Sequence, residues 1–194
     1  MNMLKEIKTT VLATLALLAV CCVIYPVFVF GLGQLLFPAK ADGSIVYDAN
    51  GKPIASTLLG QTFAADKYFN PRPSAAGNGY DSTSSGGSNL GSLSQTLHDN
   101  VKQRVADYRK ANNLGDTQLV PGDAVTASAS GLDPHISVKN ALLQLPRVAK
   151  ARGMSEYDLK KLMDECTDGP DFGILGDAGV NIIKLNLALD GKYK

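Results

Sequence analysis

An uncharged, largely apolar stretch near the start of the chain constrains its fold more than any other feature. Residues 9–39 contain no Asp, Glu, Lys or Arg, whereas all but three of the 37 charged residues follow from Lys40 onward. The hydrocarbon core of a bilayer is about 30 Å thick and takes roughly 20 helical residues. We therefore expect residues 9–37 to cross a membrane once, with residues 1–8 on one side and residues 38–194 on the other.

Two other interpretations of this stretch stay open at the level of sequence. The basic start and an A-x-A outline at residues 39–41 resemble a cleaved secretory signal. The apolar region of such a signal is only about 7 to 15 residues long, which favours a retained anchor. The sequence LAVC at residues 18–21 has the outline of a lipidation site, but the bulky Val20 replaces the small residue expected there. Cys21 and Cys22 then count as apolar helix residues.

The charges on either side of the span predict its orientation. The start carries Lys5 and Lys8 against one Glu6, whereas Lys40 is followed closely by Asp42. The positive-inside bias places residues 1–8 in the cytoplasm and the remainder outside. Within the span, small residues form a surface that lets another helix approach closely, although such residues are also ordinary in membrane helices. They are Thr10, Ala13, Thr14, Ala16 and Ala19. Pro26 is expected to kink the helix.

The rest of the chain is sized and charged for a single extramembrane domain. Its 155 residues suffice for one core, and its positive and negative charges balance. Nucleic acid is therefore not expected as a partner, because no basic stripe is present. Cys166 is the only cysteine in this part, so an intrachain disulfide within the domain is excluded.

Local patterns predict a mixed helix and strand domain of the α+β class. Residues 43–57 are typical of a hairpin with a type I′ turn at Asn50 and Gly51. Three helices are expected: one from the Ser92 cap to about residues 112–115, one after Ser137 that Pro146 breaks or kinks, and one after Ser155. Alternating apolar residues predict a strand over residues 181–190. The glycine- and serine-rich residues 77–94 are expected to form a surface or binding loop.

Catalytic motifs are mostly missing. No phosphate-binding G-x-x-x-x-G-K-[ST] sequence is present. Ser88, Asp133 and His135 could supply a hydrolase on paper, but Ser88 lacks the second glycine of the nucleophile elbow. His98 and His135 are too few for a His-rich metal site, and helix and loop roles suffice for them. Two polar stretches, at residues 84–91 and 126–137, are either tight turns or places where a ligand approaches the backbone.

Seven motifs in a specific order resemble one family. They are GQTF at residues 60–63, YFNPRPSA at 68–75, YDSTSSGGSNLG at 80–91, TASASGLDPHIS at 126–137, PRVAKARG at 146–153, VNIIKLNLALD at 180–190, and the N-terminal helix itself. Together they resemble the C subunit of the Kdp-type bacterial potassium-transporting P-type ATPase. Ser92 and Val138 stand where the family often has proline, and both differences concern turn preference alone.

This resemblance implies a non-catalytic accessory subunit of a high-affinity, ATP-driven potassium uptake complex in the bacterial inner membrane. The implied partners are a channel-like potassium-binding subunit, a P-type catalytic subunit and a small membrane peptide. The P-type phosphorylation sequence DKTG is absent here, so hydrolysis belongs to another subunit. Alternatives are a membrane-anchored hydrolase and a small-ligand-binding domain of the cell envelope.

The resemblance also implies candidate site residues. An ATP-related loop that would raise the ATP affinity of the catalytic subunit corresponds to Ser85, Gly86, Gly87, Ser88 and Asn89, with no other cofactor indicated. If the domain lies over the outer mouth of a potassium pore, the candidate contacts with other subunits are Gln61, Phe63, Tyr68, Phe69 and Arg72, because aromatic residues and arginine dominate interface energetics. Further candidates are Ser130, Asp133 and His135. Tyr68 and Phe69 fit the core equally well. We expect Arg72→Ala to weaken assembly without changing the melting of the domain.

Overall fold

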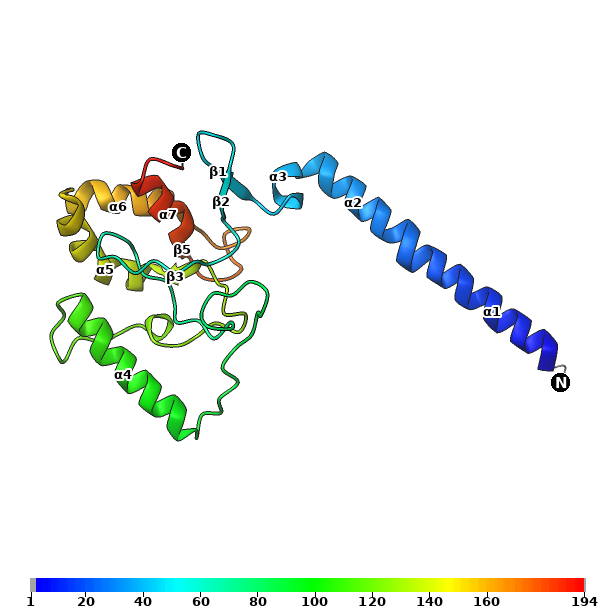
Figure 1. Ribbon diagram of the computed structural model, residues 1–194, viewed down its shortest axis with the longest axis horizontal. Coiled ribbons are helices and arrows are strands. Elements are labelled where there is room, and N and C mark those ends of the chain that lie inside the picture. Colours follow the sequence, from blue (N-terminus) through cyan, green and yellow to red (C-terminus); the bar gives the residue numbers. More distant parts are fainter. Residues whose placement is uncertain (1–2, 194) are drawn as a thin grey trace. The chain divides into compact units, whose positions relative to one another are not determined.

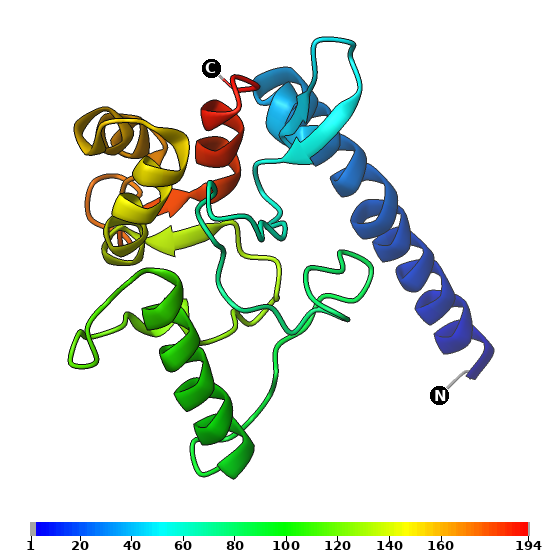
Figure 2. The same cartoon turned by 60° about the vertical axis from the view of Figure 1, so that its left-hand side comes forward.

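The computed structural model describes residues 3–193 and divides the chain into two compact units, Met1–Ile45 and Val46–Lys194. Figure 1 shows the first as a long helix and the second as a mixed helix and strand domain, and Figure 2 gives a second view. The order of elements confirms the predicted fold class, an apolar N-terminal helix followed by an α+β domain.

The N-terminal unit is one continuous helical rod. It comprises α1 (Met3–Ala19), a π-helical turn (Val20–Ile24) and α2 (Tyr25–Leu36), and the short α3 (Pro38–Ala41) follows. Together Met3–Leu36 form a helix long and apolar enough to cross a membrane. In the π turn the Tyr25 N–H donates to the Val20 carbonyl, so the wide turn lies directly before Pro26, which has no N–H to donate.

The hairpin is confirmed, but its predicted turn type is wrong. Strands β1 (Ile45–Tyr47) and β2 (Pro53–Ser56) pair in a two-stranded sheet. In the connection the Gly51 N–H donates to the Asp48 carbonyl, and the Asp48 carboxylate accepts from the Asn50 and Lys52 amides. Gly51 has a φ of 76°, whereas Asn50 is not left-handed, so the turn lacks the two positive φ angles of type I′.

A small antiparallel sheet lies at the centre of the domain. Its strands are β3 (His135–Ser137), β5 (Gly179–Asn181) and β4 (Thr167–Asp168), in the spatial order β3-β5-β4. His135 lies opposite Asn181, and Thr167 lies opposite Val180. Sequence analysis did not predict β3 or β4, because strands of two or three residues are too short to show a period.

The three predicted helices are present, with two corrections. Helix α4 (Gln95–Ala111) begins after Ser94 rather than Ser92, and the Ser94 hydroxyl accepts from the Leu97 amide. Helix α5 (Val138–Arg152) begins after its Ser137 cap and continues through Pro146, so the predicted break is wrong. Pro146 is exposed, where water can satisfy the carbonyl that proline leaves without a donor. Helix α6 (Glu156–Glu165) begins after Ser155 as expected.

The predicted strand over residues 181–190 is wrong, because this segment is helix α7 (Ile182–Leu189). The Asn181 side chain caps it by accepting from the Ile183 and Lys184 amides. Most of α7 is buried, so apolar residues occur on every side and imitate the alternation of a strand. Helices α5, α6 and α7 pack around one core, and α4 projects at the other end of the domain (Figures 1 and 2).

Candidate functional site

The fold brings the two polar stretches that sequence analysis singled out against one another. The Gly86 N–H donates to the Ser130 carbonyl at 2.9 Å, and the Ser85 hydroxyl donates to the same oxygen at 3.0 Å. From the proline-rich segment, the Ser74 hydroxyl donates to the Gly131 carbonyl at 2.7 Å and accepts from the Tyr80 amide. Residues 74–87 and 128–131 therefore form one hydrogen-bonded surface.

Glycines allow this close approach. Gly131 has a φ of 68°, and a Cβ there would lie 2.7 Å from the Ala76 Cβ and backbone nitrogen. A Cβ at Gly87 would lie 3.1 Å from the Ala129 carbonyl oxygen. At both positions the backbone of one loop lies against the backbone of the other. Sequence analysis left open whether these stretches are tight turns or places where a ligand approaches, and the contacts favour tight turns.

A hollow of about 660 Å³ opens beside these loops. It is lined by Leu58, Leu59, Arg72, Ser85, Ser128, Ala129, Ser130, Leu132, Asp133 and Pro134. On its wall Arg72 Nη1 contacts the Asp133 carboxylate at 2.8 Å. The Tyr80 hydroxyl donates to the Arg72 carbonyl at 2.6 Å, and Arg72 Nε is buried without a hydrogen-bond partner among the described residues. The hollow thus combines two exposed leucines with a paired arginine.

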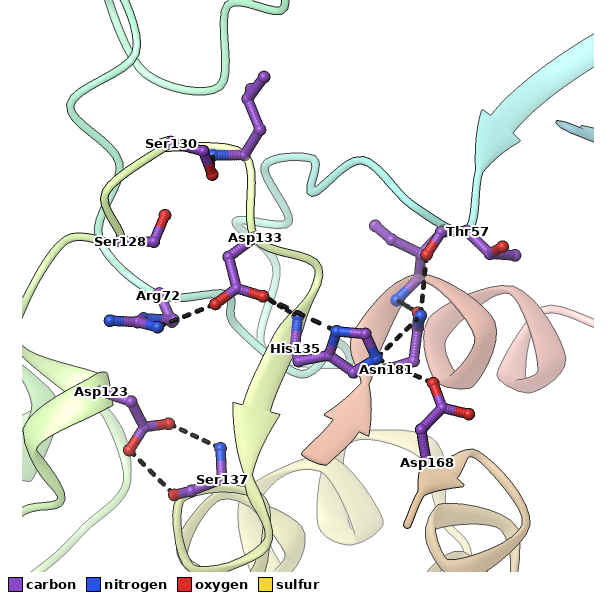
Figure 3. A network of polar contacts seen from close by, with 12 residues as sticks. Thr57, Arg72, Asp123, Ser128, Ser130, Asp133, His135, Ser137, Asp168 and Asn181 are labelled. Atoms are coloured by element: carbon purple, nitrogen blue, oxygen red, sulfur yellow. Dashed lines mark hydrogen bonds and ion pairs between the residues drawn. The ribbon is translucent and has the colours of Figure 1, made fainter. Parts of the chain in front are cut away.

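His135 lies next to this hollow and connects the strands of the central sheet (Figure 3). Its Nε2 lies 2.8 Å from the Asp168 carboxylate on β4 and 3.4 Å from the Asn181 amide on β5. Asp133 accepts from the His135 backbone N–H, and its carboxylate lies 3.7 Å from Nδ1. Lys184 on α7 closes the cluster by binding Asp168 at 2.9 Å.

The charges of this cluster stabilise one another. The nearby Asp133 carboxylate raises the pKa of His135; burial opposes this, and Asp168 adds to it. Burial would raise the pKa of Asp133, but hydrogen bonds with His135 and Arg72 outweigh it and lower that pKa. Burial likewise opposes the effect of Lys184 and His135, which together lower the pKa of Asp168. The alternating charges therefore form a structural chain across the sheet.

This arrangement does not fit a serine hydrolase. A general base needs a free ring nitrogen within hydrogen-bond reach of its nucleophile. Both nitrogens of His135 face carboxylates instead, and Ser88 lies exposed on its loop. In the part of the chain that the structure describes, no group of three or more His, Cys, Asp or Glu residues could hold a metal ion.

A second polar network holds the YFNPRPSA segment against the helices. Arg147 on α5 is buried and donates to the carbonyls of Asp66 and Tyr68 and to the side-chain oxygens of three neutral residues. Those three are Asn70, Asn112 and Gln144. The Asn186 side chain on α7 bonds both the N–H and the carbonyl of Phe69. Sequence analysis missed these partners, because all of the pairings except Arg147 with Gln144 join segments at least 35 residues apart.

Of the candidate aromatic residues, one is fully buried and two are partly exposed. Phe69 is fully buried in the core, which decides between the two roles that the sequence leaves open for it. Tyr68 is partly buried, and its hydroxyl donates to Asp190 while the Arg152 guanidinium lies over its ring. Phe63 packs against Tyr68 with ring centroids 5.2 Å apart, and Gln61 is partly exposed. The surface candidates are thus Gln61, Phe63, Tyr68, Arg72, Ser130, Asp133 and His135.

The chain thus combines a helix long and apolar enough to cross a membrane with a domain whose polar side chains bind one another and form no recognisable catalytic site. These features are typical of a membrane-anchored accessory protein. The family model described as "KdpC: K+-transporting ATPase, c chain" matches residues 7–191. The chain belongs to this family. It is therefore a subunit of the Kdp potassium-transporting ATPase complex and not its catalytic subunit.

Similar proteins cover nearly the same length. The chain is 51% identical over 168 residues to the "Potassium-transporting ATPase KdpC subunit" of Mycobacterium bovis (strain BCG / Pasteur 1173P2), covering 87% of this chain and 88% of that protein. It is 46% identical over 189 residues to the protein of the same name from Koribacter versatilis, covering 97% and 96%. The match with the Nitratidesulfovibrio vulgaris protein is 47% over 189 residues, covering 97% and 95%.

Proposed function

We propose that this chain is an accessory subunit that holds a high-affinity potassium uptake complex together from the outer face of the membrane. Residues 9–37 cross the inner membrane with residues 1–8 in the cytoplasm, and residues 38–194 form a periplasmic domain. The partners are a channel-like potassium-binding subunit, a P-type catalytic subunit and a small membrane peptide. Potassium is the transported ion of the complex, and the chain itself supplies no catalytic group.

The observation that carries this proposal is the hollow beside the Arg72 and Asp133 pair. An arginine fixed by an ion pair next to two exposed leucines is typical of an interface anchor, because such pairs combine apolar contact with oriented donors. The loops around it are joined by backbone hydrogen bonds, so the surface is organised before it meets a partner. A preorganised surface loses little entropy on binding.

The membrane helix supports the same role. The small residues Thr10, Ala13, Thr14, Ala16 and Ala19 lie on α1, which has no buried residue within its own unit. Small side chains let helices pack closely in lipid, where van der Waals contact drives association. We propose that this surface contacts a membrane helix of another subunit.

A second proposed role is that of a catalytic chaperone, in which Ser85, Gly86, Gly87, Ser88 and Asn89 bind ATP and raise the nucleotide affinity of the catalytic subunit. The observation in its favour is that Ser85 lines the same hollow as the cationic Arg72. Two observations weigh against it. The Gly86 N–H already donates to Ser130, and Asp133 neutralises Arg72. The proposed topology would also keep the loop away from cytoplasmic ATP.

Thiol labelling separates the two roles. Ser84 lies on the exposed side of the loop, so Ser84→Cys in a background without Cys21, Cys22 and Cys166 presents one accessible thiol. In intact cells with a permeabilised outer membrane, we expect this thiol to react with an impermeant reagent. Reaction only after lysis would place the loop in the cytoplasm and would favour the nucleotide role.

Deleting residues 1–37 tests the membrane contact. We expect the truncated domain to stay folded, because its core lies entirely within residues 46–194, and to lose co-purification with the other Kdp subunits. Full recovery of the complex with the truncated domain would show that the helix is only a tether.

A further inference from the structure

The loop between β4 and β5 exposes three large apolar side chains close together in the sequence. In residues 169–178, Phe172 is 94% exposed, Ile174 is 82% exposed and Leu175 is 59% exposed. Clustered apolar side chains of this kind mark interaction sites, whereas single exposed ones are ordinary. None of these residues takes part in the cluster around His135 or in the hollow beside Arg72.

The backbone holds this tip in one conformation. Asp171 and Leu175 exchange two backbone hydrogen bonds of 2.9 Å, and the Gly173 N–H donates to the Pro170 carbonyl at 3.0 Å. Phe172 has a φ of 53°, a left-handed conformation that is rare for a bulky residue. At its base the loop follows Asp168, which His135 and Lys184 hold in place. The tip is therefore held by its own backbone hydrogen bonds, and the residue with the rare φ angle, Phe172, is the most exposed of the three.

The length of the connecting chain limits what this tip can reach. The membrane-capable helix ends at Leu36 and the second unit begins at Val46. The intervening residues 37–45 span at most about 30 Å when fully extended. A domain on so short a connection has two kinds of surface to meet, which are lipid headgroups and the exposed faces of the other Kdp subunits.

The charges of the loop distinguish between these two. Asp171 and Asp177 flank the apolar tip, and residues 169–178 contain no Lys or Arg. Acidic side chains are repelled by a membrane surface that carries anionic lipids, where basic residues are favoured instead. The same charges suit a protein pocket with an apolar floor and a basic rim.

We infer that residues 170–177 form a docking loop, with Phe172 and Ile174 inserted into an apolar pocket on the extracytoplasmic face of another Kdp subunit and Asp171 and Asp177 facing basic groups at its rim. The inference rests on the proposed role in assembly and adds a second contact, separate from the hollow at Arg72. An aromatic anchor in such a pocket supplies a large share of the binding energy of an interface.

Photocrosslinking tests this contact in the whole complex. Phe172→benzoylphenylalanine in the full chain, assembled with the other subunits in membranes, should crosslink on irradiation to another Kdp subunit. The matched control is Tyr157→benzoylphenylalanine, because Tyr157 is an aromatic residue on α6 that is 79% exposed and outside the loop. Crosslinking of position 172 to lipid alone, or to no other subunit, would overturn the inference.

Recovery of the complex gives an independent measurement. The double variant Phe172→Ser with Ile174→Ser should melt as the wild-type full chain does, since both side chains are solvent-exposed, but recovery of the complex should fall roughly tenfold or more. Tyr157→Ser should leave recovery unchanged. Normal recovery with the double variant would refute the docking loop, whereas failure of the wild-type chain to co-purify would refute the assembly role itself. Should the double variant melt early, the crosslink at position 172 decides.

Discussion

The helical part of the domain and the irregular residues 57–94 are stabilised in different ways. Helices α5, α6 and α7 with the central sheet bury a continuous apolar core that includes Leu145, Leu159 and Leu185. Residues 57–94 contain no helix or strand, and polar side chains hold them to that core through Arg147, Gln144 and Asn186. The stability of the helical part depends on apolar packing. The irregular part depends on a few polar side chains that each make several hydrogen bonds.

This difference explains why the candidate surface lies where it does. A regular element satisfies its own backbone groups, whereas an irregular segment must find partners for them elsewhere. Here the hydrogen bonds from Gly86 to Ser130 and from Ser74 to Gly131 fix the loops around the Arg72 and Asp133 pair. The irregular part can therefore present backbone and side-chain groups to another subunit, while the helical part supplies the stability.

The largest expected effect comes from the side chain that joins the two parts. Phe69 belongs to the irregular segment but is fully buried among the helices. Phe69→Ala should lower the free energy of unfolding by about 3 to 5 kcal/mol, because it leaves a cavity in the core. Chemical denaturation of the full chain in detergent measures this. A loss below about 1 kcal/mol would show that Phe69 packs poorly.

A somewhat smaller effect is expected from Arg147→Met, which keeps apolar volume but removes every donor. Each buried acceptor left without a donor costs about 1 to 3 kcal/mol. Water can reach some of the five oxygen atoms that accept from Arg147, which reduces the total. We expect a loss of about 3 kcal/mol in the free energy of unfolding. Arg147→Lys should recover only part of it, since one ammonium cannot match the guanidinium geometry. Wild-type stability of Arg147→Met would contradict the account of the irregular part.

Arg72→Ala should affect assembly more than stability. The ion pair with Asp133 revises the sequence-based expectation of unchanged melting, because its loss removes a contact within the domain. Arg72 and Asp133 remain about a quarter exposed, so the cost should be only about 1 kcal/mol or less. Co-purification of the complex should fall more clearly. Asp133→Asn is the matched control for the ion pair, and wild-type assembly by Arg72→Ala would remove Arg72 from the interface.

The smallest effect concerns pH. Because Asp133 and Asp168 raise the pKa of His135, the stability that protonated His135 contributes is complete below its unfolded pKa of about 6.5. That contribution is lost as the pH rises through the higher folded pKa. We expect the melting temperature to decline slightly as the pH rises above about 6.5, and the decline to be reduced in His135→Gln. An equal decline in both proteins would assign it to other groups.

Much of the fold follows from local patterns in the sequence. The apolar length of α1 and α2, and the serine caps of α5 and α6, each specify an element through neighbouring residues. Helix α7 does not, because burial on every side removes the polar face that marks a helical period. The short strands β3 and β4 depend on pairing with a distant segment, which no local pattern contains.

The candidate site was predictable only in part. Sequence motifs indicated Arg72, Asp133 and His135, but not that Arg72 binds Asp133 across 61 positions of the chain. Asp168 and Lys184 were missed altogether, since they join the cluster only when β4 and α7 pack together. The loop tip at Phe172 carries no sequence motif, and its exposure becomes visible only in the folded structure.

Assembly in the presence and absence of this chain tests the central claim most directly. The other Kdp subunits are purified from cells with and without it, and potassium-stimulated ATP hydrolysis is measured on each preparation. We predict little intact complex and little potassium-stimulated hydrolysis without the chain, with both restored when the full chain is expressed again. An intact complex of wild-type activity that lacks the chain would contradict its proposed role as an assembly subunit.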